Sequence, residues 1–446
     1  MTRPWLSSRR SFLQQSLAAG IGLPLLARSA QAAAPSDIIR HASFGASGMA
    51  GADLGEIAKH SKVKLICVAE VDTSRATKLK EQFPDLRVYQ DWRQMLDKEH
   101  KNLDTVNVST PDHMHAPMAM SSMQLGLNVY CQKPLTHNIA ESRALTEYAR
   151  EKKLVTQMGI QIHSSREYKT AIALIQQGAI GKVHTVHTWS SKKWGDPTGK
   201  PTRSDPVPAT LDWDMWLGVC ETRPFVGGGY YHPGNWRKRV DFGTGTFGDM
   251  GCHIFDPVFG ALALTGPTTV RSEGAPPNDY NWATDAIVRF TFPKTPYTAE
   301  KGVDITWYDG DQRPPQDVVK SAVGDRALPD QGSLFLGEKG AMILPHIAMP
   351  ILLPERDFAG YDVPKIDGEN HWHQFIDAVR GETKTSTTFD YAGPLTESVL
   401  LGCVATRFPK TTLEWDAPGL KFTNLPAANA FLKRPYRKGW EVPGLG

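Results

Sequence analysis

The chain has 446 residues, with 50 Lys and Arg against 47 Asp and Glu, for a formal net charge of +3. This balance, without a basic stripe, argues against a nucleic-acid-binding protein. No segment is apolar over the roughly 20 residues that cross a bilayer, so we expect a soluble mature protein, long enough for two domains. Five cysteines without CxxC spacing indicate neither a zinc knuckle nor a disulfide framework.

Residues 1–34 are typical of a twin-arginine export signal. Arg9 and Arg10 precede Ser11-Phe12-Leu13, an apolar run follows over residues 17–27, and Ala30-Gln31-Ala32 offers small residues to a signal peptidase. This route carries proteins that have already folded, often around a cofactor. We therefore expect a periplasmic protein that engages the Tat translocase during export.

The pattern after the signal predicts a strand over 38–44, a glycine-rich turn, and a helix to about residue 60. Small residues in such a turn let the backbone approach a pyrophosphate, whose charge is stabilised at the helix N-terminus. A second strand over 63–71 ends at Asp72, where an acid would accept hydrogen bonds from an adenosine ribose. The candidate residues for binding a dinucleotide are therefore Gly45, Ser47, Gly48, Met49 and Asp72.

The choice between the two nicotinamide dinucleotides depends on this acid. Asp72 would repel a 2'-phosphate, which favours NAD over NADP. Arg75 lies close enough in the sequence to soften that preference, so NADP stays open as an alternative.

Further strands over 104–108 and 128–131 alternate with helices over 116–125 and 139–152. This alternation predicts a doubly wound parallel sheet, and we assign residues 37–160 to an NAD(P)-binding Rossmann domain. Ligands of such sheets bind beyond the carboxyl ends of the strands. The turns after two of these strands, Ser109-Thr110-Pro111 and Gln132-Lys133-Pro134, should therefore face the nicotinamide.

The pair His113 and His115 has no third ligand nearby in the sequence, so we predict no metal site.

Several of these motifs together resemble the Gfo/Idh/MocA family of oxidoreductases, which includes glucose-fructose oxidoreductase and inositol dehydrogenase, and in particular its exported twin-arginine branch. The matching motifs are Thr110-Pro111 with His115, Gln132-Lys133-Pro134 in place of the family's Glu-Lys-Pro, Gly159-Ile160-Gln161-Ile162-His163, Gly178 to Val183, Pro394 to Glu397 and Leu413 to Asp416. The resemblance implies cofactor-binding roles for Ser109, Thr110, Pro111, His115, Lys133 and Gln161.

The resemblance also implies an α+β domain over 161–430 with a large, mostly antiparallel open sheet from about Val183 to Leu344, followed by a tail over 431–446. Strands over 183–189 and 286–292, and helices over 371–380 and 395–406, fit this expectation. The exposed face of the sheet would pair subunits into a homo-dimer or tetramer.

The catalytic chemistry is expected in the glycine-rich segment 243–256. Asp249 and His253 are four residues apart, so both project from one face of a helix, which matches the family's Asp-x-x-x-His. In an alcohol oxidation His253 would take the hydroxyl proton while Lys133 stabilises charge on the same oxygen. Asp249 would orient His253 or bind a neighbouring hydroxyl. Gln132 departs from the family's acid and removes a charge beside Lys133.

Aromatic and donor side chains are mixed in the segment 230–239, as in proteins that bind sugars. We take a sugar, polyol or glycoside as the substrate class, with Lys133, His163, Trp236, Arg237, Asp249 and His253 as candidate substrate-binding residues. Trp236 could equally be a core or dimer contact.

Three functions fit the sequence. The first is an oxidoreductase that transfers a hydride and keeps its cofactor bound, because a periplasmic enzyme has no nicotinamide pool. The second is a redox-assisted glycoside hydrolase or lyase that oxidises, eliminates and re-reduces. Release of aglycone from a nitrophenyl glycoside without net NADH would indicate it, but the family's exported glycosidases carry a histidine-rich segment that this chain lacks. The third is a non-catalytic sugar-binding protein with a relict site.

Overall fold

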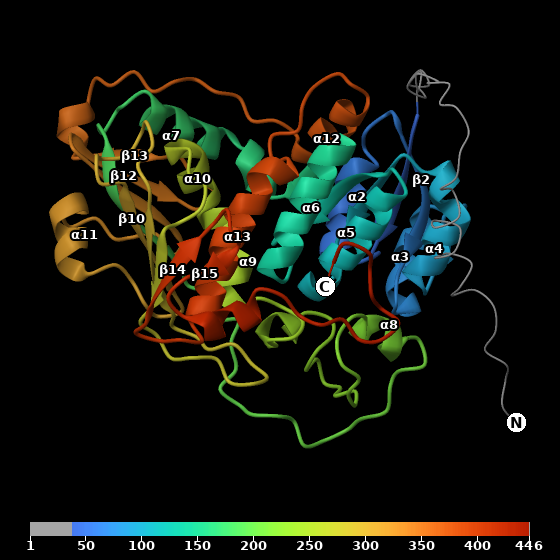
Figure 1. Ribbon diagram of the computed structural model, residues 1–446. Coiled ribbons are helices and arrows are strands. Elements are labelled where there is room, and N and C mark those ends of the chain that lie inside the picture. Colours follow the sequence, from blue (N-terminus) through green and yellow to red (C-terminus); the bar gives the residue numbers. More distant parts are fainter. Residues whose placement is uncertain (1–37, 446) are drawn as a thin grey trace, which may run out of the picture. The chain divides into compact units, whose positions relative to one another are not determined.

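Two β-sheets organise residues 38–445, the part of the chain that the computed structural model describes (Figure 1). The predicted export signal lies outside these residues. The first sheet has six parallel strands in the order β3-β2-β1-β4-β5-β6, which is the order of a Rossmann sheet. Its strands are β1 (Ile39–Phe44), β2 (Val63–Ala69), β3 (Arg87–Tyr89), β4 (Thr105–Val108), β5 (Asn128–Gln132) and β6 (Thr156–Gly159).

Helices connect these strands, which confirms the predicted doubly wound architecture. They are α2 (Met49–Ile57), α3 (Thr77–Gln82), α4 (Trp92–Glu99), α5 (His115–Gln124) and α6 (Ile139–Lys152). One boundary differs from the prediction: β2 ends at Ala69, two residues earlier than expected. Glu70 is therefore the first residue beyond the strand.

The second sheet has nine strands in the order β13-β12-β11-β7-β10-β9-β8-β14-β15. Only the pair of β7 and β10 is parallel, so the sheet is mixed and mostly antiparallel, as predicted. It extends beyond the expected end at Leu344. The strands are β7 (Val183–Ser190), β8 (Thr269–Ser272), β9 (Ile287–Phe292), β10 (Val303–Asp309), β11 (Gly332–Gly337), β12 (Gly340–Pro345), β13 (Ile351–Leu353), β14 (Thr412–Asp416) and β15 (Lys421–Phe422).

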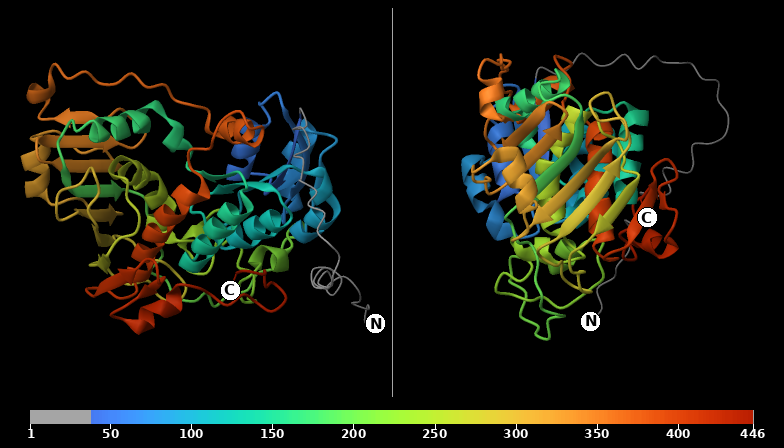
Figure 2. Two further views of the ribbon diagram at one scale, coloured as in Figure 1. Left: turned by 45° about the horizontal axis from the view of Figure 1, so that its top comes forward. Right: turned by 90° about the vertical axis from the view of Figure 1, so that its left-hand side faces the viewer.

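Helices pack on both faces of this sheet (Figure 2). One face contacts α9 (Gly245–Ile254) and α13 (Phe389–Ala405), with α7 (Arg166–Gln176) and α10 (Asp256–Leu262) packed beside them. On the other face, Val323 of α11 (Gln316–Val323) is buried in a cluster with Trp189, Leu334 and Ile343. Part of the face that was expected to pair subunits is thus covered by the chain's own helix. The remaining α-helices are the short α8 (Trp213–Leu217) and α12 (His371–Val379).

The segment beyond residue 431, predicted as a tail, packs against the first sheet's helices. Trp440 and Val442 are buried in the main core, and the guanidinium of Arg93 lies 4.4 Å from the Trp440 ring centroid. Gln124 donates from Nε2 to the Pro443 carbonyl at 2.7 Å. One continuous core therefore joins buried side chains from both sheets.

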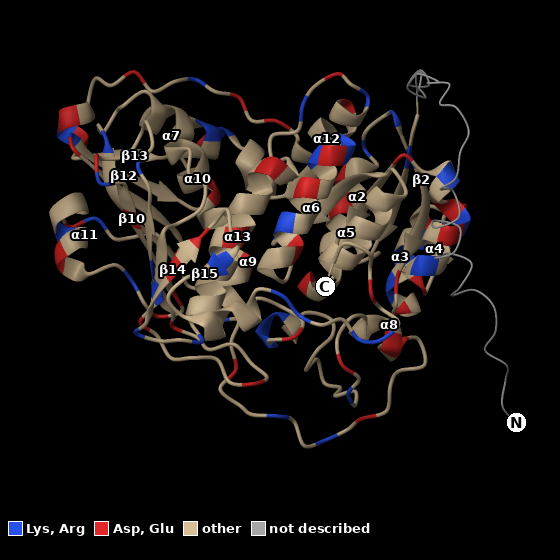
Figure 3. Ribbon diagram, in the orientation of Figure 1, with Lys and Arg blue, Asp and Glu red and all other residues tan. Residues whose placement is uncertain are grey.

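The five cysteines are all buried and free. Figure 3 shows basic and acidic residues interspersed over the helices and loops of both sheets. Within residues 38–445, no helix combines the length and apolarity that a membrane crossing requires.

Candidate active site

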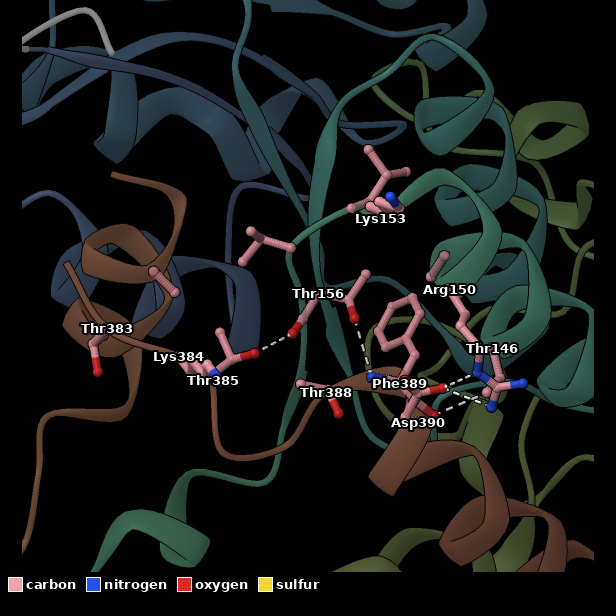
Figure 4. A pocket seen from close by; sticks show the side chains of 14 residues that line it. Thr146, Arg150, Lys153, Thr156, Thr383, Lys384, Thr385, Thr388, Phe389 and Asp390 are labelled. Carbon is pink, nitrogen blue, oxygen red and sulfur yellow. Dashed lines mark hydrogen bonds and ion pairs between the residues drawn. The ribbon is translucent and has the colours of Figure 1, made fainter. Parts of the chain in front are cut away.

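Two cavities adjoin the first sheet, at opposite ends of its strands. One, of about 350 Å³, lies where β6 begins (Figure 4). Its polar groups are largely paired: Thr385 Oγ1 donates to the Thr156 carbonyl at 2.7 Å, and the Phe389 amide donates to Thr156 Oγ1 at 3.0 Å. The other, of about 250 Å³, lies beyond the carboxyl ends of β1, β2, β4 and β5, where ligands of such sheets bind. We call this second one the cofactor pocket.

The cofactor pocket brings together most of the predicted dinucleotide residues and part of the predicted catalytic set. Its lining includes Gly45, Ser47, Gly48, Met49, Ser109, Thr110, Pro111, Lys133, Trp236 and Arg237. The predicted residues Asp72, His115, Gln161, His163, Asp249 and His253 are not part of this lining.

The glycine loop, residues 45–48, has a backbone with positive φ at both of its glycines, and at one of them it also passes close to a neighbouring strand. Gly45 has φ of +97°, and a Cβ there would lie 2.9 Å from the Ser109 carbonyl oxygen. Gly48, with φ of +62°, immediately precedes Met49, the first residue of α2. The loop thus passes close to β4 and presents the N-terminus of a nine-residue helix to the pocket, which suits a pyrophosphate.

Glu70, rather than Asp72, is the acid that lines the cofactor pocket. It is 8% exposed and accepts the Ala46 and Asp72 amides, each at 3.1 Å, and burial raises its pKa. Asp72 instead accepts from Ser74 and lies 3.2 Å from His232 Nε2. This difference follows from the earlier end of β2, since the first residue beyond the strand is the one beside the glycine loop.

His115 lies behind the pocket wall rather than in it. Its Nδ1 is 2.7 Å from the Pro134 carbonyl oxygen and its Nε2 is 2.9 Å from that of Thr110. Burial lowers the pKa of this imidazole to about 4. The His115 ring therefore lies between the two turns that were predicted to face the nicotinamide.

A buried carboxylate on α2, which the sequence did not point to, organises the same wall. Asp53 accepts hydrogen bonds from Gln132 Nε2 at 2.9 Å, Ser109 Oγ at 2.7 Å and Trp372 Nε1 at 2.8 Å. Burial raises its pKa. Gln132, at the position of the family's acid, thus donates to a carboxylate supplied by another element. Gln161 is only partly buried, and its Nε2 donates to the Tyr130 hydroxyl at 3.3 Å.

Lys133 and Asp249 form the central contact of the site. Lys133 Nζ lies 2.5 Å from Asp249 Oδ1 and also donates to its carbonyl at 3.0 Å, and Arg237 Nε donates to the same Oδ1 at 3.1 Å. Although burial alone would raise it, the charges of Lys133 and Arg237 hold the pKa of Asp249 well below its usual range. Asp249 is therefore engaged with two cations, and among the described residues it makes no hydrogen bond to His253.

His253, on the same helix as Asp249, carries a neutral ring. Burial, with the nearby charge of Lys133, lowers its pKa well below the ordinary value, and its buried Nδ1 has no hydrogen-bond partner among residues 38–445. Its ring centroid is 5.9 Å from that of His346, whose Nδ1 lies 2.8 Å from the Tyr168 hydroxyl. His346 and Tyr168 carry no motif that would have identified them from the sequence.

A carboxylate orients the imidazole of His163. Its Nδ1 lies 2.8 Å from Asp256 Oδ1, and the Tyr391 hydroxyl donates to the same oxygen at 2.7 Å. With Nδ1 directed at Asp256, Nε2 is the ring nitrogen that remains for a ligand. The carboxylate–imidazole contact that was expected between Asp249 and His253 is thus found between His163 and Asp256, the first residue of α10.

Asp112 is a further buried carboxyl group in the cofactor pocket. It is 3% exposed and accepts a hydrogen bond from Thr244 Oγ1 at 2.8 Å, just before α9. Burial raises its pKa to about 7, although Arg237, Thr244 and Lys133 act in the opposite direction. It was not singled out by the sequence, although it directly follows the predicted strand-end turn Ser109-Thr110-Pro111. Among the described residues, no three His, Cys, Asp or Glu side chains gather as metal ligands would.

Parts of the chain are similar in sequence to curated dehydrogenases. The chain is 22% identical over 189 residues to levoglucosan dehydrogenase of Pseudarthrobacter phenanthrenivorans, which is 42% of this chain and 40% of that protein. It is 24% identical over 149 residues to myo-inositol 2-dehydrogenase of Thermotoga maritima, or 33% of this chain and 40% of that one. The matches therefore span less than half of these curated relatives.

Solved structures share the fold over a longer stretch. The WlbA dehydrogenase of Bordetella pertussis, solved in complex with NADH and UDP-GlcNAcA, superposes with a TM-score of 0.61 at 15% identity, covering 85% of this chain and 98% of that one. The aldose-aldose oxidoreductase of Caulobacter crescentus, complexed with glycerol, gives a TM-score of 0.56 at 14% identity, with 85% and 100% covered.

Two family descriptions match consecutive parts of the chain. Residues 39–160 match the oxidoreductase family with an NAD-binding Rossmann fold, and residues 174–325 match the C-terminal alpha/beta domain of the same family. The two matches cover more than half of the sequence in the expected order. The chain belongs to the Gfo/Idh/MocA family of oxidoreductases.

Proposed function

We propose that this protein oxidises or reduces a hydroxyl-bearing carbon of a sugar, polyol or glycoside, with NAD as the hydride carrier. The observation that supports this most directly is the contact of Lys133 with Asp249. It joins the cofactor pocket to α9, the helix that also carries the neutral His253. The names of the curated relatives, which are levoglucosan and inositol dehydrogenases, support the substrate class.

The cofactor pocket fits a nicotinamide dinucleotide. Ser47, Gly48 and the start of α2 would hold the pyrophosphate, and Glu70 would accept hydrogen bonds from the adenosine ribose. The strand-end turn at Thr110 and Lys133 would lie at the nicotinamide end. When bound, the cofactor supplies a ring that accepts or returns a hydride.

The chain's own residues would handle the hydroxyl group of the substrate. Lys133 Nζ would donate a hydrogen bond to the reacting oxygen and stabilise negative charge on it. His253, which is neutral, would take the hydroxyl proton. Asp249 holds the Lys133 ammonium in place, and the free Nε2 of His163 could accept from a neighbouring hydroxyl.

The proton acceptor can be tested with His253→Asn. We expect kcat on a panel of inositols, levoglucosan and aldoses to fall by roughly 100- to 10,000-fold, since this is the usual contribution of a general base. NADH affinity, measured by fluorescence titration, should stay within threefold because His253 does not line the cofactor pocket. His184→Asn, at an exposed position of β7, is the matched control. Full activity of His253→Asn would assign the proton transfer to a different base.

The ribose acid can be tested by comparing Glu70→Gln with Asp72→Asn, which each remove one negative charge. After removal of bound nicotinamide, Glu70→Gln should lower the ratio of NADH to NADPH affinity by tenfold or more. The remaining Arg75 in the pocket would then favour a 2'-phosphate. Asp72→Asn should change this ratio less than threefold. The opposite order of effects would assign the role to Asp72.

The raised pKa of Asp112 predicts a pH dependence of stability. A carboxyl group whose pKa rises from 3.8 in the unfolded chain to about 7 in the folded one costs stability progressively as pH rises between these values. Removing it in Asp112→Asn should therefore stabilise the protein relative to wild type by up to about 1.4 kcal/mol per pH unit between about pH 5 and pH 7, with no further gain above. Paired thermal unfolding curves measure this, and a pH-independent difference would contradict it.

We further propose that residues 1–34 direct export to the periplasm through the Tat translocase, with the cofactor already bound. Each cycle would then return its hydride to a second substrate, as the name of the structural neighbour aldose-aldose oxidoreductase suggests for that enzyme.

We also propose that the exposed part of the second sheet pairs subunits into a homo-dimer or tetramer.

Cofactor retention is tested on protein purified from the periplasm. Denaturation should release about one nicotinamide per chain, identified by mass spectrometry, and the native protein should interconvert two sugars without added NAD. Protein that carries no nicotinamide and turns over normally with added NAD would contradict retention while leaving the hydride-transfer chemistry intact.

A further inference from the structure

A third cavity, of about 350 Å³, lies behind α9 and shares no lining residue with the cofactor pocket. Its walls come from the residues just before α9, the end of α13 and the carboxyl-terminal segment. We call it the basic cavity and define it by the side chains Trp282, Arg407, Phe431, Lys433 and Arg434.

Arg407 is the main cation of the basic cavity. Its guanidinium carbon lies 5.2 Å from the ring centroid of Trp282 and 4.6 Å from that of Phe431, and burial lowers its pKa. Within residues 38–445, no carboxylate or hydrogen-bond acceptor pairs with this guanidinium. Two aromatic rings hold the group in place, while its N–H donors are left without protein partners.

Arg434 also lacks a carboxylate partner among the described residues. Its Nη1 donates to the Asp241 carbonyl at 2.8 Å, and its Nη2 lies 2.9 Å from Cys220 Sγ. The Asp241 carboxylate pairs instead with Arg223. Asp279, the other acid of the lining, is exposed and makes no ion pair with either guanidinium. Two partly buried guanidiniums therefore adjoin one cavity without a direct carboxylate partner, although Asp241, Asp279 and Glu141 act on them at longer range. The N–H donors of Arg407 in particular remain available to an anion that enters the cavity.

We propose that the basic cavity binds the oxyanion of a small organic molecule, either a carboxylate or a phosphate. A guanidinium presents parallel N–H donors that match two oxygens of such a group. Leu400 and Val404 add apolar surface for the rest of the molecule. The bound group would lie beside Thr244, whose hydroxyl bonds Asp112 in the cofactor pocket and whose carbonyl accepts the Gly248 amide of α9 at 3.1 Å.

The proposal is tested by calorimetric titration of the full folded protein at constant ionic strength. Inorganic phosphate and glucuronate are the two probes, and chloride is the reference. We expect at least one oxyanion to bind wild type, and Arg407→Gln to bind it at least tenfold more weakly. Arg356→Gln, which removes the same charge from a side chain that is 85% exposed, should bind like wild type. Binding of phosphate alone would identify a phosphorylated ligand, and binding of glucuronate alone an organic acid.

Two results would overturn the proposal. One is the absence of any oxyanion binding beyond that of chloride. The other is equal binding to wild type and Arg407→Gln, as expected if phosphate occupied the glycine loop of the cofactor pocket. If Arg407→Gln does not fold, Lys433→Gln at the exposed rim replaces it, with an expected loss of about threefold. Unchanged affinity in that variant would count against the site.

Discussion

The buried ion pair between Lys133 and Asp249 is the contact on which the organisation of the active site depends. One partner directly follows a strand of the Rossmann sheet and the other lies on a helix that packs against the second sheet. Their side chains are only 11% and 12% exposed, so neither charge could remain there without the other. The pair therefore sets the position of α9, and with it His253, relative to the cofactor pocket. Arg237 adds a second positive charge and keeps the carboxylate ionised.

The charged Lys133 and Asp249 have neutral imidazoles as neighbours. The imidazoles of His253, His115 and His346 all have lowered pKa values because they are buried, and Lys133 adds to the effect at each of them. Their rings are neutral at physiological pH. A positively charged Lys133 beside neutral imidazoles suits a reaction in which a hydroxyl oxygen gains negative charge as it loses its proton. Asp112, with a pKa near neutrality, is a carboxyl group lining the cofactor pocket that can change its charge there.

Much of the fold could be predicted from local patterns, because alternating strands and helices carry their signals within ten to fifteen residues. The helix predicted over 139–152 matches α6, and the strand predicted over 183–189 differs from β7 by one residue at its end. The identity of the pocket acid was missed, because Val71 continues the apolar run and hides the end of β2. Asp53 was missed as the partner of Gln132, which lies 79 residues away in the sequence. His346 reaches His253 through tertiary packing that no spacing encodes.

The packing of Trp440 and Val442 against the first sheet's helices bears on the order in which this protein can fold. The Rossmann strands are made first, but part of the surface that covers their helices comes from residues 440–442, which are made much later. Until those residues have been synthesised, the apolar surface that they cover stays exposed to solvent. The first domain therefore reaches its final packing only after residues 440–442 have left the ribosome.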